Sequence, residues 1–178
     1  MTPVPRPTRV LAPAALVLSL TGAAQAASVG DYPMEPQPVA EGVYAVITPT
    51  RELPNPENKG WNSNSAFVIT DDGVLVFDTG SSETIGEALR GAIARVTDQP
   101  VRWVVVSHGH GDHWLGNAAF AGADVEIITT PEVAERMRTE AQTWIDTFQR
   151  MTEGATGDSR IVAPTTVCLL YTSPSPRD

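Results

Sequence analysis

Short apolar runs along the chain predict β-strands. The runs are rich in Val, Ile and Phe and are bounded by Gly, Pro, Asp or Ser. They comprise residues 43–47, 65–70, 74–77, 101–106 and 124–129. Asp71-Asp72-Gly73 lies between the second and third runs and is typical of a hairpin turn, so these two strands should pair antiparallel.

Two longer segments have apolar residues at helical spacing. The first begins after Ser81 or Ser82, either of which can cap a helix, and its apolar stripe covers residues 85–96. Gly86 and Gly91 interrupt this stripe, and each should weaken the helix by about 1 kcal/mol if it lies in the interior.

The second helical segment begins after Thr130, which can cap it, and runs to about Met151 with Pro131 at the first helical position. Its apolar stripe consists of Val133, Met137, Ala141, Ile145 and Phe148. The 101–106 run shows little alternation, which predicts a central strand buried on both faces. Together these elements predict an α/β layered sheet that is antiparallel at first.

Both ends of the chain are expected to lie outside the folded domain. Residues 1–26 have the features of a secretory signal, namely early arginines, an apolar run and the cleavage pattern Ala24-Gln25-Ala26. The alternative, a buried helix, is opposed by four prolines in this segment. Residues 27–42 are Pro-rich and polar and form an N-terminal arm. We therefore expect a periplasmic or secreted protein that does not associate with a membrane after signal removal.

The last residues, Cys168–Asp178, follow no structural pattern. They resemble, residue for residue, one reading frame of a transposase-type sequencing adapter, so the native sequence is expected to end near Val167. A disordered Ser- and Pro-rich tail is the alternative. The segment holds the single cysteine of the chain, which leaves residues 27–167 without a disulfide or a Cys zinc ligand. The net charge of −9 argues against nucleic acid as a partner.

All three histidines of the chain lie in one run, residues 108–113, which reads His-Gly-His-Gly-Asp-His. The run follows the predicted central strand, where α/β sheets commonly place ligand sites. Neutral imidazole and carboxylate are donors that zinc and iron bind. The alternative is an exposed loop with chance histidines, but the grouping of all three around one aspartate favours a metal site.

The spacing within this run predicts ligands for two metal ions. Residues i and i+2 of an extended segment point the same way, so His108 and His110 can converge on one metal. The intervening glycines leave room and backbone freedom for the loop to curl. Asp112 and His113 lie beyond the curl and can bind a second metal about 4 Å away. Water between two zinc ions ionises near neutral pH and becomes a hydroxide nucleophile.

The segment Ser107–His113 resembles the HxHxDH signature of the metallo-β-lactamase-fold hydrolases. The hydrophobic strand that ends in Asp78-Thr79-Gly80 is also similar to a strand of that family, and the resemblance covers about residues 40–165. It implies an α/β fold, the first half of an αβ/βα metallo-β-lactamase-type sandwich. By this resemblance, residues 43–167 form a truncated domain, with the site at the edge between two sheets.

The resemblance also implies the metal ligands and their supports. The first zinc would bind His108 and His110, and the second would bind Asp112 and His113, with Asp112 as the catalytic residue. Asp78 would orient the metal loop by hydrogen bonds, or it is a simple turn residue. The family pattern further needs a later histidine and, in most members, a bridging aspartate and another histidine. The chain ends before these residues, so we expect an N-terminal fragment without a competent dinuclear site.

The leading hypothesis is a zinc-dependent hydrolase that cuts an ester, thioester, lactam or related bond of a small molecule with a metal-bound hydroxide. An iron-dependent persulfide-type dioxygenase of the same fold is the second hypothesis, and a non-catalytic metal-binding accessory protein is the third. With the export signal, Gly116-Asn117 resembles the periplasmic zinc hydrolases associated with quinoprotein and sulfur-oxidation systems. In the loop over residues 48–62, Trp61 either contacts substrate or packs on its own loop.

Overall fold

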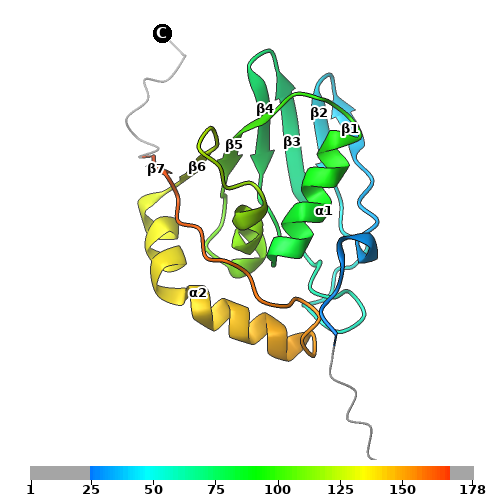
Figure 1. The fold of residues 1–178 in the computed structure, drawn as a ribbon, viewed down its shortest axis with the longest axis vertical. Helices are drawn as coiled ribbons and strands as arrows, with labels where there is room; N and C mark the ends of the chain where they lie inside the picture. The colour runs from blue at the N-terminus through cyan, green and yellow to red at the C-terminus, as the bar shows by residue number, and fades with distance from the viewer. Residues whose placement is uncertain (1–24, 169–178) are drawn as a thin grey trace, which may run out of the picture.

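The computed structural model describes residues 25–168. Within this range the chain forms seven strands, two α-helices and three short 3₁₀ helices (Figure 1). Nearly all of the signal-like segment, and all of the last segment except Cys168, lie outside the described residues. The expectations for both segments therefore stay predictions. No helix within residues 25–168 is long and apolar enough to cross a membrane.

One mixed sheet organises the fold, and its strands lie side by side in sequence order. Neighbouring strands from β1 to β4 are antiparallel, and those from β4 to β7 are parallel, as the prediction of an initially antiparallel sheet requires. The strands are β1 (Gln37–Ala40), β2 (Val43–Val46), β3 (Ser65–Thr70), β4 (Gly73–Phe77), β5 (Val101–Val105), β6 (Glu126–Thr129) and β7 (Thr166–Val167). This order places the carboxyl ends of β4, β5 and β6 at one edge of the sheet, where loops commonly carry a site.

The predicted strands are present, and the hairpin between β3 and β4 is confirmed. Thr70 pairs with Gly73, whose φ of 138° favours glycine. The sequence pattern does not predict β1 or β7. All residues of β1 are exposed, so no apolar alternation marks this strand, and it exists through its pairing with β2. The segment predicted to be a Pro-rich, polar arm thus contributes an edge strand.

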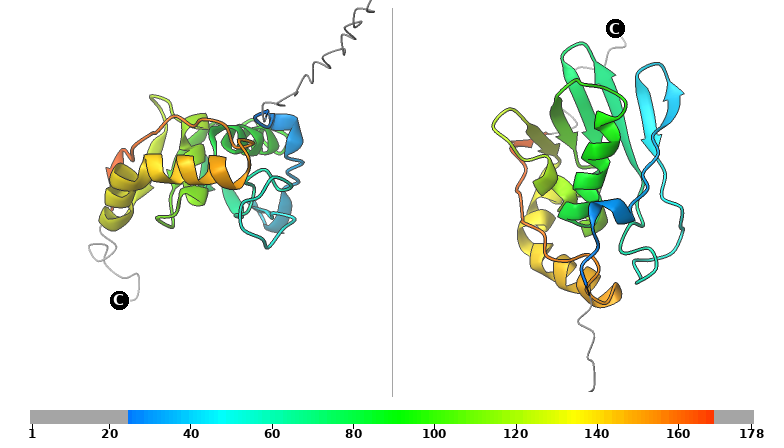
Figure 2. Two further views of the ribbon diagram at one scale, coloured as in Figure 1. Left: turned by 90° about the horizontal axis from the view of Figure 1, so that it is seen from below. Right: turned by 45° about the vertical axis from the view of Figure 1, so that its right-hand side comes forward.

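Both predicted helices are confirmed. They are α1 (Glu83–Ala94) and α2 (Pro131–Met151). Ser82 caps α1 and Thr130 caps α2, each through a hydroxyl oxygen that accepts a backbone N–H of the first turn. The predicted stripe of α2 buries Met137, Ala141, Ile145 and Phe148. In Figure 1 α2 runs across the lower end of the molecule, and it faces the viewer in the left panel of Figure 2.

Two glycines in α1 have different surroundings. Gly86 is buried where α1 meets the 3₁₀ helix η3 (Leu115–Ala119), and a Cβ there would lie 2.4 Å from the backbone oxygen of Gly116. Gly91 is exposed, and a Cβ there would meet nothing within 4 Å. Close packing therefore explains Gly86, whereas Gly91 only lowers the helix propensity.

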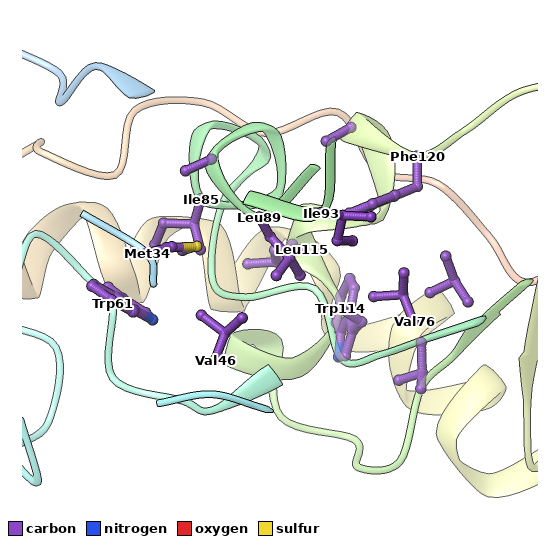
Figure 3. Close-up of a cluster of buried hydrophobic side chains, with 14 of the residues drawn as sticks. Met34, Val46, Trp61, Val76, Ile85, Leu89, Ile93, Trp114, Leu115 and Phe120 are labelled. Atoms are coloured by element: carbon purple, nitrogen blue, oxygen red, sulfur yellow. The ribbon is translucent and has the colours of Figure 1, made fainter. Parts of the chain in front are cut away.

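Within residues 25–168, a hydrophobic core lies between one face of the sheet and the helices (Figure 3). Phe67, Val76 and Val104 supply the sheet side, and Leu89 and Trp114 lie opposite them. Each of these five side chains is at most 1% exposed. Burial of each contributes about 1.5–3 kcal/mol relative to exposure. The core therefore holds β4 and β5, and with them the start of the loop Ser107–His113, which carries the three histidines and is called the histidine loop.

The opposite face of the sheet keeps partial exposure. Trp103 and Val105 of β5 are half-buried, and Phe77 at the end of β4 is 38% exposed. The prediction that the 101–106 strand is buried on both faces is therefore wrong for the described residues, because helices cover one face only. One sheet with helices on one face confirms the predicted α/β class, the first half of an αβ/βα sandwich.

Candidate metal centre

The histidine loop lies at the carboxyl ends of β4 and β5, as predicted. Val106 still donates its N–H to Ile128 of β6 at 2.9 Å, and the chain then leaves the sheet. It passes through η2 (Gly111–His113) and continues into η3. The backbone oxygen of His113 accepts the N–H of Thr79, which follows β4, at 2.9 Å. The loop is thus attached to the strands on which it lies.

The loop brings all three imidazole rings together. The ring centroids of His108 and His110 are 4.3 Å apart, and those of His108 and His113 are 5.1 Å apart. The planes of each pair are close to perpendicular, at 74° and 77°. The rings that the sequence assigns to two metal ions are therefore neighbours, and their role as ligands stays a prediction.

A carboxylate orients the His113 ring. Nδ1 of His113 lies 2.8 Å from Oδ2 of Asp78, so Nδ1–H donates to the carboxylate and Nε2 is left for a metal. Nε2 lies 3.8 Å from Oδ1 of Asp112. Burial disfavours the charged ring, but the hydrogen bond and negative charge of Asp78, with the charge of Asp112, outweigh it and raise the pKa of His113. An environment that favours a proton at this ring also favours a metal cation in its place.

His108 has the opposite tendency. Burial, followed by the positive charges of His110 and His113 when these are protonated, lowers the pKa of His108. The neutral imidazole is therefore favoured at neutral pH, and this is the form that binds zinc or iron.

Asp78 is both a turn residue and a support of the loop. Its φ of 56° lies in the left-handed region, which aspartate tolerates better than most residues. Its side chain accepts three hydrogen bonds, from the Ser107 N–H at 2.8 Å, from the Ser107 hydroxyl at 2.6 Å and from Nδ1 of His113. The hydrogen bonds that the family resemblance implies are thus present, and one carboxylate holds the first and last residues of the loop.

Asp112 is held by two residues that no sequence motif indicates, Asn62 and Ser63. Nδ2 of Asn62 donates to Oδ2 of Asp112 at 2.9 Å, and the Ser63 hydroxyl donates to the Asp112 backbone oxygen at 2.5 Å. These residues lie 50 and 49 positions upstream, at the end of the loop before β3. Their polar character directly before a strand is the only signal in the sequence, and it does not indicate their partner.

Helix α2 packs directly on the glycines of the loop. A Cβ on Gly109 would lie 2.9 Å from Cδ of Arg136, and one on Gly111 would lie 2.7 Å from Cβ of Trp144. Neither glycine has a positive φ. The predicted need for space is therefore confirmed, because a side chain at Gly109 or Gly111 would collide with α2. The predicted need for glycine's backbone freedom is not, because neither residue has a positive φ. The Trp144 ring lies 5.0 Å from the His110 ring, so α2 also borders the predicted metal ligands.

The donors fit zinc in kind, since imidazoles and a carboxylate are its usual nitrogen and oxygen ligands. Within residues 25–168, no group of three or more His, Cys, Asp or Glu side chains is arranged so that it could hold a metal ion. A catalytic zinc ion commonly takes three protein ligands. The role of His108, His110, Asp112 and His113 as metal ligands therefore stays a prediction for the described residues.

Trp61 is part of the core. Its side chain is 6% exposed and packs in the same cluster as Met34 (Figure 3). Its burial favours packing over contact with substrate, and the packing is in the core rather than only on its own loop as predicted.

The comparisons with known proteins agree with the signature around the histidines. The family model described as the metallo-beta-lactamase superfamily matches residues 58–170, which is more than half of the chain. The chain belongs to the metallo-β-lactamase superfamily. Members of this superfamily are generally metal-dependent hydrolases. The chain matches none of the curated proteins.

Several solved structures share the fold. One is the metallo-β-lactamase FIM-1 from Pseudomonas aeruginosa in its mono-zinc form, which is 15% identical in sequence with a TM-score of 0.52. The match covers 78% of this chain and 52% of the FIM-1 chain. A metallo-β-lactamase from Pontibacter korlensis is 18% identical with a TM-score of 0.52, and the match covers 76% of this chain and 52% of the other. The sec-alkylsulfatase Pisa1 from Pseudomonas sp. is 18% identical with a TM-score of 0.50, and the match covers 66% of this chain and 18% of the sulfatase chain. The chain thus spans about half of these lactamases and less than a fifth of the sulfatase.

Proposed function

We propose that the full-length protein is a zinc-dependent hydrolase of an ester, thioester, lactam or related bond in a small molecule. The observation that carries this proposal is the grouping of three imidazole rings beside Asp112 on one loop, which Asp78 holds at both ends. Membership of a superfamily of metal-dependent hydrolases supports the reaction type. The mono-zinc form of FIM-1 supports zinc as the metal.

The residues of the loop would have distinct roles. His108 and His110 would hold one zinc ion, and Asp112 with His113 a second, with further ligands from the part of the fold that this chain does not span. When bound, zinc polarises the bond to be cleaved and lowers the pKa of a coordinated water. Asp78 keeps the proton of His113 on Nδ1, so that Nε2 is free to bind.

The expected location and partners are part of the same proposal. The signal-like residues 1–26 support export to the periplasm or the medium. The net charge of −9 supports a small-molecule substrate over nucleic acid. With Gly116-Asn117 after the signature, these features favour the periplasmic branch associated with quinoprotein and sulfur-oxidation systems.

Asp112→Ala in the full-length protein tests the proposed reaction. We expect kcat/KM with ester, thioester and lactam substrates to fall by more than about 100-fold, because loss of even an indirect support of a metal ligand costs 10–100-fold. Asp124→Ala is a suitable control, since that side chain is 85% exposed. Metal analysis of the purified wild type should give zinc.

Two results would contradict the proposal. Iron in the wild type, together with oxygen uptake on a persulfide substrate, would identify a dioxygenase. Unchanged turnover in Asp112→Ala would favour a metal-binding accessory protein without catalysis at this site.

A further inference from the structure

We propose that Asn62 is a positioning residue for the second metal site, because its side-chain amide determines which oxygen of Asp112 faces His113. Nδ2 of Asn62 donates to Oδ2 of Asp112 at 2.9 Å. The other oxygen, Oδ1, lies 3.8 Å from Nε2 of His113. The two oxygens of the Asp112 carboxylate therefore differ in role: Oδ2 accepts the hydrogen bond from Asn62, and Oδ1 faces the predicted metal position. This inference rests on the proposed function.

The segment that carries Asn62 is held firmly on both sides. Trp61 is buried in the core, and its backbone oxygen accepts the Thr48 hydroxyl at 2.8 Å. Ser63 is 8% exposed and donates to the backbone oxygen of Asp112. The segment thus contacts Asp112 at two points, one on the backbone and one on the side chain. The Ser63 hydroxyl fixes the backbone of Asp112, and the Asn62 amide restricts rotation of its carboxylate.

The NH₂ group of the Asn62 side chain, and not its carbonyl oxygen, makes the contact with Asp112. Oδ1 of Asn62 is buried and has no hydrogen-bond partner among the described residues. Turning the amide over would place this oxygen against Oδ2 of Asp112, and two acceptors at that distance repel each other. The amide therefore has one acceptable orientation. Since a buried acceptor without a partner opposes folding, the bond from Nδ2 to Asp112 accounts for an amide at this position.

Without this bond, the carboxylate of Asp112 is free to rotate about its terminal torsion, which is intrinsically broad. Outer partners of metal ligands typically contribute 10–100-fold to metal affinity. We therefore expect Asn62→Ala to weaken the ion at Asp112 and His113 by about 10–100-fold. The ion at His108 and His110 should keep its affinity, because Asn62 donates no hydrogen bond to either histidine.

The test is a two-step Zn²⁺ titration of the full-length protein against a competing chelator. Asn64→Ala is the matched control, because Asn64 lies in the same segment, is exposed and uses only its oxygen, which accepts the Thr48 N–H at 2.9 Å. Loss confined to one of the two steps in Asn62→Ala, with Asn64→Ala like wild type, supports the inference. Equal loss in both steps, or no loss, overturns it. Asn62→Asp and Asn64→Asp repeat the comparison without a change of size, and only the former should weaken binding.

A metal-free measurement separates this inference from the proposed function. In the ¹⁵N spectrum of the apoprotein, Asp112→Ala should shift the side-chain amide resonances of Asn62 and leave those of Asn64 in place. If Asn62 does not respond, the inference is wrong whichever metal the protein binds. If Asn62 responds but the wild type contains iron or hydrolyses none of the substrates, the proposed function fails and the role of Asn62 in orienting Asp112 stands.

Discussion

Gly116→Ala is expected to destabilise the metal-free protein by about 3 kcal/mol, at the upper end of the usual cost of overpacking. The new Cβ would lie 2.1 Å from the backbone oxygen of Thr79 and 2.8 Å from its carbonyl carbon. Backbone atoms cannot rotate away as a side chain can, so the strand end or η3 must move. Because the N–H of Thr79 is bonded to His113, this movement would reach the histidine loop. Urea unfolding followed by circular dichroism measures the effect.

Gly91→Ala provides the matched control. The substitution is the same, but Gly91 is exposed on α1 and its Cβ would meet nothing within 4 Å. We expect a gain in stability of about 1 kcal/mol, the difference in helix propensity between glycine and alanine. If both variants unfolded at the wild-type urea concentration, the close approach of η3 to Thr79 would be wrong.

Asp78→Ala is expected to lower the stability of the metal-free protein by about 3 kcal/mol. The change removes three hydrogen bonds to a carboxylate that is 8% exposed, and a bond to a charged group contributes about 1.5–3 kcal/mol net, but removal of the buried charge also relieves its desolvation penalty. Zinc affinity should fall as well, because the tautomer of His113 is no longer defined. Urea unfolding and Zn²⁺ titration measure the two effects. Asp71→Ala, in the exposed turn after β3, should change stability by less than about 0.5 kcal/mol.

Asp78→Asn separates the turn from the carboxylate. Asparagine adopts positive φ readily, whereas other L-residues lose roughly 1–2 kcal/mol there, so this variant should be about 1 kcal/mol more stable than Asp78→Ala. Its amide oxygen can still accept the Ser107 N–H, but its NH₂ group cannot accept the Nδ1–H of His113. Zinc affinity should therefore remain low. Wild-type affinity in Asp78→Asn would contradict the role of the carboxylate.

Sequence patterns predicted the elements that bury apolar side chains. Strands β2 to β6 carry β-branched and aromatic residues, and both helices have caps and a stripe at helical spacing. The histidine loop was found for a different reason, since all three histidines of the chain lie within it. In each case the signal is local, because neighbours in sequence suffice to recognise it.

Features that depend on distant neighbours were not predicted. The exposed strand β1 has no apolar pattern and is defined by its partner β2. The contact of Asn62 with Asp112 joins residues 50 positions apart. The apolar run of β5 predicts more burial than the strand has, because such a run does not show how many faces of the strand are covered by another layer. These properties arise from packing between elements, which a single sequence does not display.

The double attachment of the histidine loop has a consequence for the thermodynamics of metal capture. Since Asp78 binds both Ser107 and His113, the backbone between them is ordered before any ion arrives. Ordering a free loop costs about 1–2 kcal/mol of conformational entropy per residue, and here folding has already met that cost. The enthalpy of coordination is then opposed mainly by desolvation. If the loop binds zinc as proposed, we expect ion entry, rather than rearrangement of the loop, to limit the rate of metal uptake.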